Sequence, residues 1–221
     1  MEGEGKLKRG VQITRQCSFS VLISPALVAM SYAFYLYSTG GVGSLSWMYG
    51  IVALFGVIIL HLFGNFLGKR RSMYVGSGTL LIAISYGLAI VLGMVYVMTG
   101  QLVWTVLLII APVELLIVAA LHAHNMRQMQ KDTMDGIQVT YQTLLLVAYL
   151  LVALLVMIGL ASPYAFLVLL SFPLAMKNIK RMRKATMEDP DSLRFLDIRT
   201  ARLVLIFSLL QVMGNVVASY L

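Results

Sequence analysis

Long, continuous runs of apolar residues dominate the chain, and short polar segments separate them. A helix that crosses a bilayer needs roughly 20 apolar residues. The runs predict seven spanning helices, at Ser18–Ser38, Trp47–Leu67, Thr79–Met98, Leu102–Leu121, Gln142–Leu160, Tyr164–Ile179 and Leu203–Leu221. The sixth is short and contains Pro173, so we expect a kink or a partial span there. Strands of a membrane barrel would show short alternating segments. The pattern therefore indicates an all-α, polytopic transmembrane helical bundle.

The polar segments differ in charge according to the end of the helices at which they lie. Segments 39–46, 99–101 and 161–163 contain no charged residue, whereas all 17 Lys and Arg residues lie in or beside the segments at the opposite end. Positively charged loops stay on the cytoplasmic side of a membrane. We therefore expect a single transmembrane domain over 1–221, with a cytoplasmic basic N-terminus at 1–17 and a cytoplasmic loop at 177–202.

The composition excludes several classes of protein. Hydrophobic residues make up 60% of the chain and charged residues 12%, about half of the roughly 25% that soluble domains carry. This excludes an ordinary soluble protein and a disordered chain, and a single cysteine, Cys17, excludes an intramolecular disulfide. Residues 1–10 lack the apolar core of a cleaved signal peptide. We expect an integral protein of a bacterial inner (cytoplasmic) membrane.

The net charge of +8 would suggest nucleic acid as the partner of a soluble protein. In this chain we attribute the charge to loops that face anionic lipid headgroups. The expected partner is therefore membrane lipid, and no nucleic acid.

Polar residues gather at the basic ends of three predicted helices. Polar groups inside a bilayer are unfavourable unless paired, so they mark function or helix packing. His61, Asn65 and Lys69 follow one another at one-turn spacing on one face of the second helix. Two further groups surround the connection between the fourth and fifth helices, and their members are His122, His124, Asn125, Arg127, Gln128, Lys131, Asp132, Asp135, Gln138, Thr140, Tyr141 and Gln142. We expect all three groups to line one polar cavity that opens to the cytoplasm.

Each of these residues also has a plain structural explanation. Glu114, deep in an apolar run, is explained as a neutral, protonated carboxyl group. His61 is explained as a hydrogen-bonding group between helices. Asp132 and Asp135 are explained as partners of neighbouring basic residues on a solvated loop. Taken singly, the structural explanation is favoured for each residue, but the density of polar residues in one loop favours a joint functional role.

The connection after the fourth helix resembles a known motif. Residues 124–140 resemble the second aspartate motif of the UbiA superfamily of intramembrane aromatic prenyltransferases, which reads Asn-x-Arg-Asp-x-x-x-Asp-x-x-x-Gly and is often followed by Thr. The matching positions are Asn125, Arg127, Asp132, Gly136 and Thr140. Gln128 replaces the first aspartate of the motif.

Other segments resemble the same family in the same order. Arg15, followed by Ser18-Phe19 and Pro25, resembles its N-terminal segment, and His61 with Asn65 resembles the approach to its first aspartate motif. Residues 199–203 resemble the menaquinone-type, dihydroxynaphthoate branch. The family usually has nine helices, so this chain resembles a member that lacks one helical pair. In the first motif only Asn65 survives, because Gly68, Lys69 and Ser72 stand at the remaining positions.

The resemblance implies transfer of a polyprenyl group from a polyprenyl diphosphate to an aromatic acceptor of the dihydroxynaphthoate or hydroxybenzoate type. It also implies Mg²⁺, which prefers carboxylate and phosphate oxygens. It assigns catalysis to Asp132, Asn125 and Arg127, substrate binding to Lys131, Asn65, His61, Lys69 and Arg15, and metal binding to Asp132 and Asp135.

The missing aspartates leave two other functions open. Each lost transition-state donor removes about 3 kcal/mol, or roughly 100-fold in rate, so the chain is also explained as an inactive family member that binds a quinone, an isoprenoid lipid or a partner membrane protein. A small transporter with a proton relay through Glu114 ranks last, because no inverted repeat supports it. A relocated carboxylate such as Asp197 is a further candidate to replace the missing ones.

Overall fold

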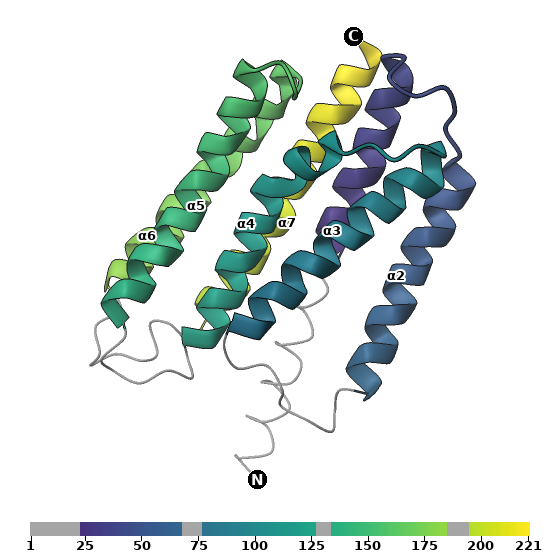
Figure 1. The fold of residues 1–221 in the computed structure, drawn as a ribbon. Helices are drawn as coiled ribbons and strands as arrows, with labels where there is room; N and C mark the ends of the chain where they lie inside the picture. The colour runs from purple at the N-terminus through teal and green to yellow at the C-terminus, as the bar shows by residue number, and fades with distance from the viewer. Residues whose placement is uncertain (1–22, 68–76, 127–133, 185–194) are drawn as a thin grey trace.

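The computed structural model describes residues 23–67, 77–126, 134–184 and 195–221, with side chains for 23–59, 87–124, 138–183 and 195–221. A first helix covers 23–38. It is followed by α2 (Trp47–Leu67), α3 (Ser77–Thr99), α4 (Thr105–Met126), α5 (Met134–Met157), the 3-10 helix η3 (Pro163–Ser171), α6 (Phe172–Lys184) and α7 (Leu196–Tyr220). These residues include no strand (Figure 1). The prediction of an all-α fold is confirmed for this part of the chain.

Several helices extend further than the apolar runs predict. α2 has the predicted bounds, but α4 continues past Leu121 to Met126. α5 begins at Met134 and α7 at Leu196, both ahead of their apolar runs. An apolar run measures the part of a helix that faces hydrocarbon, whereas backbone hydrogen bonding continues into the polar interface. For the same reason the loop predicted at 177–202 is shorter, since its first and last residues belong to α6 and α7.

The sixth predicted helix is divided into two kinds of helix. Its first part, η3, is a 3-10 helix that begins at Pro163, and α6 follows directly at Phe172. Pro173 is the second residue of α6. Proline has no backbone N–H group, but in the first turn of a helix that group has no partner within the helix. The helix type changes from 3-10 to α at Phe172, while the kink or partial span expected there stays a prediction.

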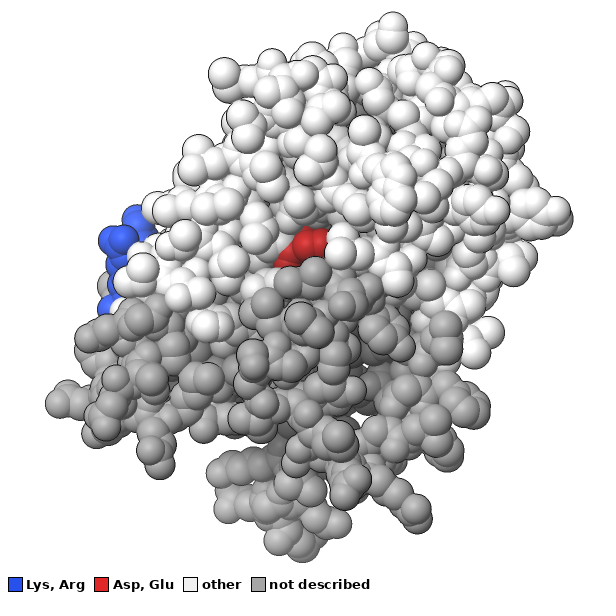
Figure 2. All heavy atoms as spheres, in the orientation of Figure 1, with Lys and Arg blue, Asp and Glu red and all other residues white. Residues whose placement is uncertain are grey.

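The helices run alternately up and down, so their ends form two opposite ends of the bundle (Figure 1). We define the basic end as the end where α2, α4 and α6 finish and α3, α5 and α7 begin. The described Lys and Arg side chains belong to α6 and the first turns of α7. Figure 2 shows basic side chains at the edge of the molecule where α6 lies. At the opposite end, exposed aromatic side chains gather, namely Tyr37, Trp47, Tyr49, Tyr96, Trp104, Tyr164 and Tyr220.

This division is typical of a protein that crosses a membrane, where aromatic rings lie at the interface and basic residues lie on one side. Three of the described helices, α4, α5 and α7, are long and apolar enough to span a bilayer. Large apolar side chains such as Ile51, Phe55 and Leu150 are exposed on the bundle surface. The structure supports a polytopic membrane protein, while the number of seven spans and the cytoplasmic N-terminus stay predictions.

α4 and α7 form the centre of the bundle (Figure 1). Within its apolar span, 67% of the residues of α4 are buried, against 33% in α5. α7 approaches η3 closely at Gly214, where a Cβ atom would lie 2.7 Å from the carbonyl oxygen of Tyr164. A side chain at this position would force the two segments apart, because that distance is below van der Waals contact. This close approach fixes the register between α7 and η3.

Candidate polar site at the basic end

The structure tests few of the side chains that the sequence assigns to chemistry. Arg15, Lys69, Arg127, Lys131 and Asp132 lie outside the described residues. The backbones of His61, Asn65, Asn125 and Asp135 belong to the basic ends of α2, α4 and α5, but their side chains also lie outside the described part. Among the side chains that are described, no group of three or more His, Cys, Asp or Glu could hold a metal ion.

A cluster of polar side chains from four helices does lie at the basic end. We call it the basic-end cluster, and its members are His124 of α4, Tyr141 of α5, Asn178 of α6, and Asp197 and Thr200 of α7. Asp197 and Thr200 are three residues apart and so share one face of α7. His124 and Tyr141 were among the residues expected at a common cavity, and the structure brings both against the same helix.

His124 and Asp197 form the contact between α4 and α7 in this cluster. The Nδ1 atom of His124 lies 3.3 Å from Oδ2 of Asp197, and the backbone N–H of Ile198 donates to Oδ1 at 2.9 Å. The carboxylate is buried, with 5% of its side chain exposed, whereas 38% of the imidazole is exposed. Asp197 lies in the first turn of α7 and His124 in the last turn of α4. The helix dipole favours a carboxylate at the N-terminus of α7.

Tyr141 and Thr200 form a second, fully buried contact. Their hydroxyl oxygens are 2.7 Å apart, and the Thr200 hydroxyl donates to the carbonyl of Leu196 at 2.7 Å. Because that bond uses the one proton of the threonine, Tyr141 is the donor between the two hydroxyls. The tyrosine hydroxyl also contacts the side chain of Asn178. Each member has partners inside the protein, so this contact ties α5, α6 and α7 together.

An exposed contact joins α5 and α6 on the outside of the cluster. Arg183 donates from Nε and Nη2 to the Oε1 atom of Gln142, at 3.1 and 3.0 Å. Lys177, Lys180 and Arg181 are exposed on the same helix. This part of α6 therefore presents cations to the surface beside a buried polar interior.

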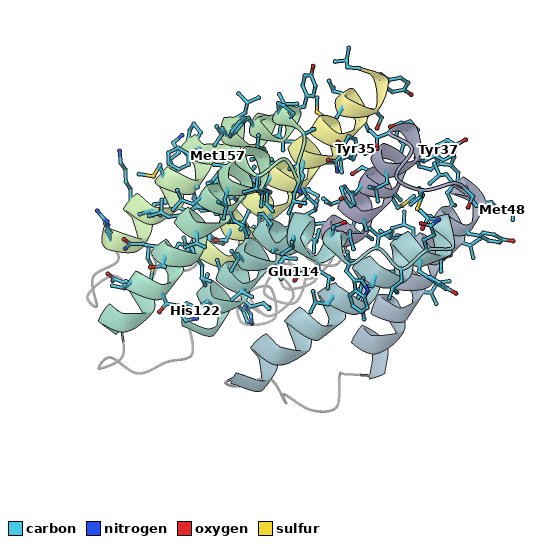
Figure 3. The ribbon with its side chains drawn as sticks, turned by 45° about the horizontal axis from the view of Figure 1, so that its top comes forward. Tyr35, Tyr37, Met48, Glu114, His122 and Met157 are labelled. Atoms are coloured by element: carbon cyan, nitrogen blue, oxygen red, sulfur yellow. The ribbon has the colours of Figure 1, made fainter. Side chains whose placement is uncertain are left out.

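Glu114 lies apart from the basic-end cluster, in the middle of α4 (Figure 3). Its exposed fraction is 7%, and neither carboxyl oxygen has a hydrogen-bond partner within the described part of the chain. The carboxyl group packs directly against Gly87 of α3, in the space that a Cβ atom would fill. The expectation that Glu114 differs from the other polar residues by its depth in the bundle is confirmed.

A row of polar side chains on α7 was missed by the sequence reasoning. The side-chain amide of Gln211 donates to the carbonyl of Ile109 at 2.8 Å, and that of Asn215 donates to the hydroxyl of Ser31 at 2.9 Å. Ile109 lies one turn before Pro112 in α4. Ser208, Gln211 and Asn215 follow at spacings of three and four, which is the signal that would have predicted a polar helix face.

The basic-end cluster has one group suited to chemistry and several suited to packing. Tyr141 and Thr200 are buried and bonded to each other. By contrast, His124 is partly exposed, and a buried carboxylate holds its Nδ1 atom. An imidazole with this support can accept or release a proton at Nε2.

Comparison with known proteins gives one informative similarity. No family model matches the chain. The chain is 32% identical over 172 residues to the UbiA prenyltransferase domain-containing protein 1 of Ailuropoda melanoleuca, a match that covers 70% of this chain and 48% of that protein. The chain thus spans about half the length of the curated relative it matches. The similarity supports a distant relationship to UbiA-like membrane prenyltransferases.

Proposed function

We propose that this chain is a shortened, divergent UbiA-type membrane protein that transfers a polyprenyl group from a polyprenyl diphosphate to an aromatic acceptor of the quinone pathway. The observation that carries this proposal is the 32% identity to a UbiA prenyltransferase domain-containing protein. The motif positions between α4 and α5 support it, because the basic-end cluster of described residues lies at the ends of the same two helices. Dihydroxynaphthoate is the first acceptor to test, since residues 199–203 resemble that branch.

The proposed site occupies the connection between α4 and α5 and the facing end of α2. Asp132 and Asp135 would hold Mg²⁺, because their carboxylates are the hard oxygen ligands that this ion prefers. Bound there, the ion would neutralise the charge of the leaving diphosphate. Arg127, Lys131, Lys69 and Arg15 would bind the diphosphate as fixed cations, and the same proposal assigns Asn125 to the diphosphate, and Asn65 and His61 to the acceptor. The apolar helix faces would shelter the isoprenoid tail.

Prenyl transfer by the purified full chain in detergent tests this proposal. The reaction would contain Mg²⁺, a polyprenyl diphosphate and dihydroxynaphthoate, with Asp132→Asn as the test variant and Asp191→Asn, outside the motif, as the matched control. We expect product from the wild type and the control and none from Asp132→Asn. Undiminished product from Asp132→Asn would refute the assignment of Asp132. The absence of product from the wild type with hydroxybenzoate as well would refute the transferase function.

A second function is favoured by the first motif, where Gly68, Lys69 and Ser72 stand in place of the family's polar and acidic residues. Under it the chain keeps the fold without the reaction and binds a quinone, an isoprenoid lipid or a partner membrane protein. Binding of a fluorescent polyprenyl diphosphate separates the two functions. Affinity that requires Mg²⁺ and is lost in Asp132→Asn supports the enzyme, whereas affinity indifferent to both supports the binding protein.

We propose the cytoplasmic membrane of a bacterium as the location, with the basic end facing the cytoplasm. The apolar exposed surface and the similarity to a UbiA-like protein support an integral membrane protein. The relative is mammalian, so it gives no support to a bacterial source. Labelling of an added cysteine at the basic end, in cells and in inverted vesicles, tests the orientation. Protection in intact cells with labelling in inverted vesicles is the expected result.

A further inference from the structure

At the contact of α4 and α7, a buried carboxylate group lies next to a partly exposed imidazole group. Asp197 is buried while His124 is partly exposed, and Nδ1 of the ring points to Oδ2 of the carboxylate. With Nδ1 engaged in this way, the nitrogen left for chemistry is Nε2. His124 also precedes Asn125, the first residue of the matched motif, so the ring belongs to the end of α4 from which the proposed site extends.

The surroundings of Asp197 are better suited to holding a histidine than to holding a metal ion. Its Oδ1 atom accepts from Ile198 N–H and its Oδ2 atom is directed to His124. The described side chains around it do not complete a set of metal ligands. The two contacts assign Asp197 the role of positioning the ring beside it, and its candidacy as a Mg²⁺ ligand stays a prediction.

A purely structural tie between helix ends would not require a buried charge. The exposed contact of Arg183 with Gln142 joins α5 to α6 at the same end without burying a carboxylate. Burial of a carboxylate is unfavourable by several kcal/mol unless it is compensated. Such an arrangement is typical of sites where a carboxylate fixes the orientation of a histidine that handles protons.

We propose that His124 accepts the hydroxyl proton of the aromatic acceptor during prenyl transfer, and that Asp197 is the residue that positions it. This inference rests on the proposed function. As the acceptor O–H bond breaks, its proton passes to Nε2 and its electron pair enters the ring. The ring carbon then forms a bond to the allylic carbon, while the allylic C–O bond breaks and its pair leaves with the diphosphate. Tautomerisation of the resulting ketone releases the ring proton to water, and His124 returns the hydroxyl proton.

The other titratable side chains described at this end are engaged differently. On α5, Tyr141 is fully buried and donates to Thr200. On α6, Arg183 binds Gln142, and on α7, Arg199 and Arg202 are exposed cations. Two described histidines lie at this end of α4, His122 and His124, and two residues along a helix place their side chains on opposite sides. In His124 the Nδ1 atom faces the buried carboxylate of Asp197, which leaves Nε2 as the proton acceptor.

Chemical rescue tests the proposal. His124→Ala is expected to lower kcat about 100-fold or more, which is the usual contribution of general base catalysis. Its KM for the polyprenyl diphosphate is expected to stay near that of the wild type. Added imidazoles should restore the rate in the order of their basicity, because the step is a proton transfer. Lys180→Gln is the control, since Lys180 is an exposed residue of α6 with no part in the proposed site, and it should keep wild-type kcat.

The role of Asp197 is tested through its dependence on His124. Asp197→Asn is expected to lower kcat by about tenfold, the loss usual for a carboxylate that orients a histidine. The same substitution in the His124→Ala background should have no further effect, because it acts through the missing ring. Equal losses in both backgrounds would show that Asp197 serves stability alone. Thermal unfolding of each variant confirms that it is folded.

The outcomes separate this inference from the proposed function. If the wild type forms no product with either acceptor, the proposed function fails and the inference falls with it. If the wild type is active and His124→Ala retains its kcat, the inference alone is wrong. Rescue that is independent of the basicity of the added imidazole would also overturn it, because it would show that the ring fills space.

Discussion

Glu114 and Asp197 are both carboxyl side chains buried in the same helical bundle, with exposed fractions of 7% and 4%. Asp197 lies at the basic end, where a backbone N–H and an imidazole stand at its two oxygens. Glu114 lies in the middle of α4 against Gly87, and within the described residues neither of its oxygens has a hydrogen-bond partner. The two groups are equally buried but differ in their surroundings. Asp197 has hydrogen-bond partners at both oxygens, whereas Glu114 has none within the described residues.

Burial alone therefore does not identify a functional acidic residue. A carboxylate with compensating donors at a helix N-terminus can remain charged and hold a histidine. A buried carboxyl group without such donors lowers the stability of the fold, even where it is closely packed. We therefore expect loss of Asp197 to affect activity and loss of Glu114 to affect stability.

The largest contrast is expected in the rate of prenyl transfer. Asp197→Asn should lower kcat by about tenfold, whereas Glu114→Gln should stay within about twofold of the wild type. The reason is that Asp197 orients His124, while Glu114 is distant from the basic end. Single-turnover assays with a polyprenyl diphosphate and dihydroxynaphthoate measure both rates. A large loss in Glu114→Gln would reverse the comparison and revive a proton relay through α4.

The second contrast concerns the contact of Glu114 with Gly87. Gly87→Ala should reduce the free energy of unfolding by about 1–3 kcal/mol, because its Cβ occupies the position of the carboxyl group and overpacks the interface of α3 and α4. Glu114→Ala should remove most of this loss in the double variant, since it vacates the same space. Unfolding by SDS in mixed micelles provides the four values of the cycle. Additive effects would show that the two residues do not compete for space.

The two carboxyl sites also show which parts of the structure the sequence can predict. The bounds of α2 follow from its apolar run, because an uncharged loop at 39–46 precedes the run and the basic residues Lys69, Arg70 and Arg71 follow it. The depth of Glu114 follows in the same way from its position inside such a run. Local pattern was sufficient wherever the property depended on a single helix and its solvent.

The contact of His124 with Asp197 could not be predicted in this way, because it joins residues 73 positions apart in the chain. It depends on the polar extensions of α4 and α7 and on the register between them, neither of which an apolar run records. Gln211 and Asn215 are an intermediate case. Their spacing shows that they share a face, but only the packing reveals Ile109 and Ser31 as their partners.

A third contrast concerns the replacement of each carboxyl by an apolar side chain of similar length. Glu114→Met should raise the free energy of unfolding by about 1–2 kcal/mol, because it removes a buried polar group without hydrogen bonds. Asp197→Leu should lower it by a similar amount, since the imidazole and the Ile198 N–H lose their acceptor. SDS unfolding measures both variants. A loss of stability in Glu114→Met would show that the carboxyl has a stabilising partner.

The smallest effect is expected at Asn215, a buried polar residue that has a hydrogen-bond partner. Its substitution measures how much such a pair contributes to the stability of this bundle. Its side chain is 7% exposed, like that of Glu114, but it donates to Ser31 at 2.9 Å, and the Ser31 hydroxyl in turn donates to the carbonyl of Val28. Hydrogen bonds between membrane helices contribute about 0.6 kcal/mol on average. The coupling of Asn215→Leu with Ser31→Ala, measured in an SDS-unfolding cycle, should therefore be near that value. A coupling several times larger would mean that polar pairing is worth more in this bundle than assumed, and the destabilisation assigned to the unpaired Glu114 would rise with it.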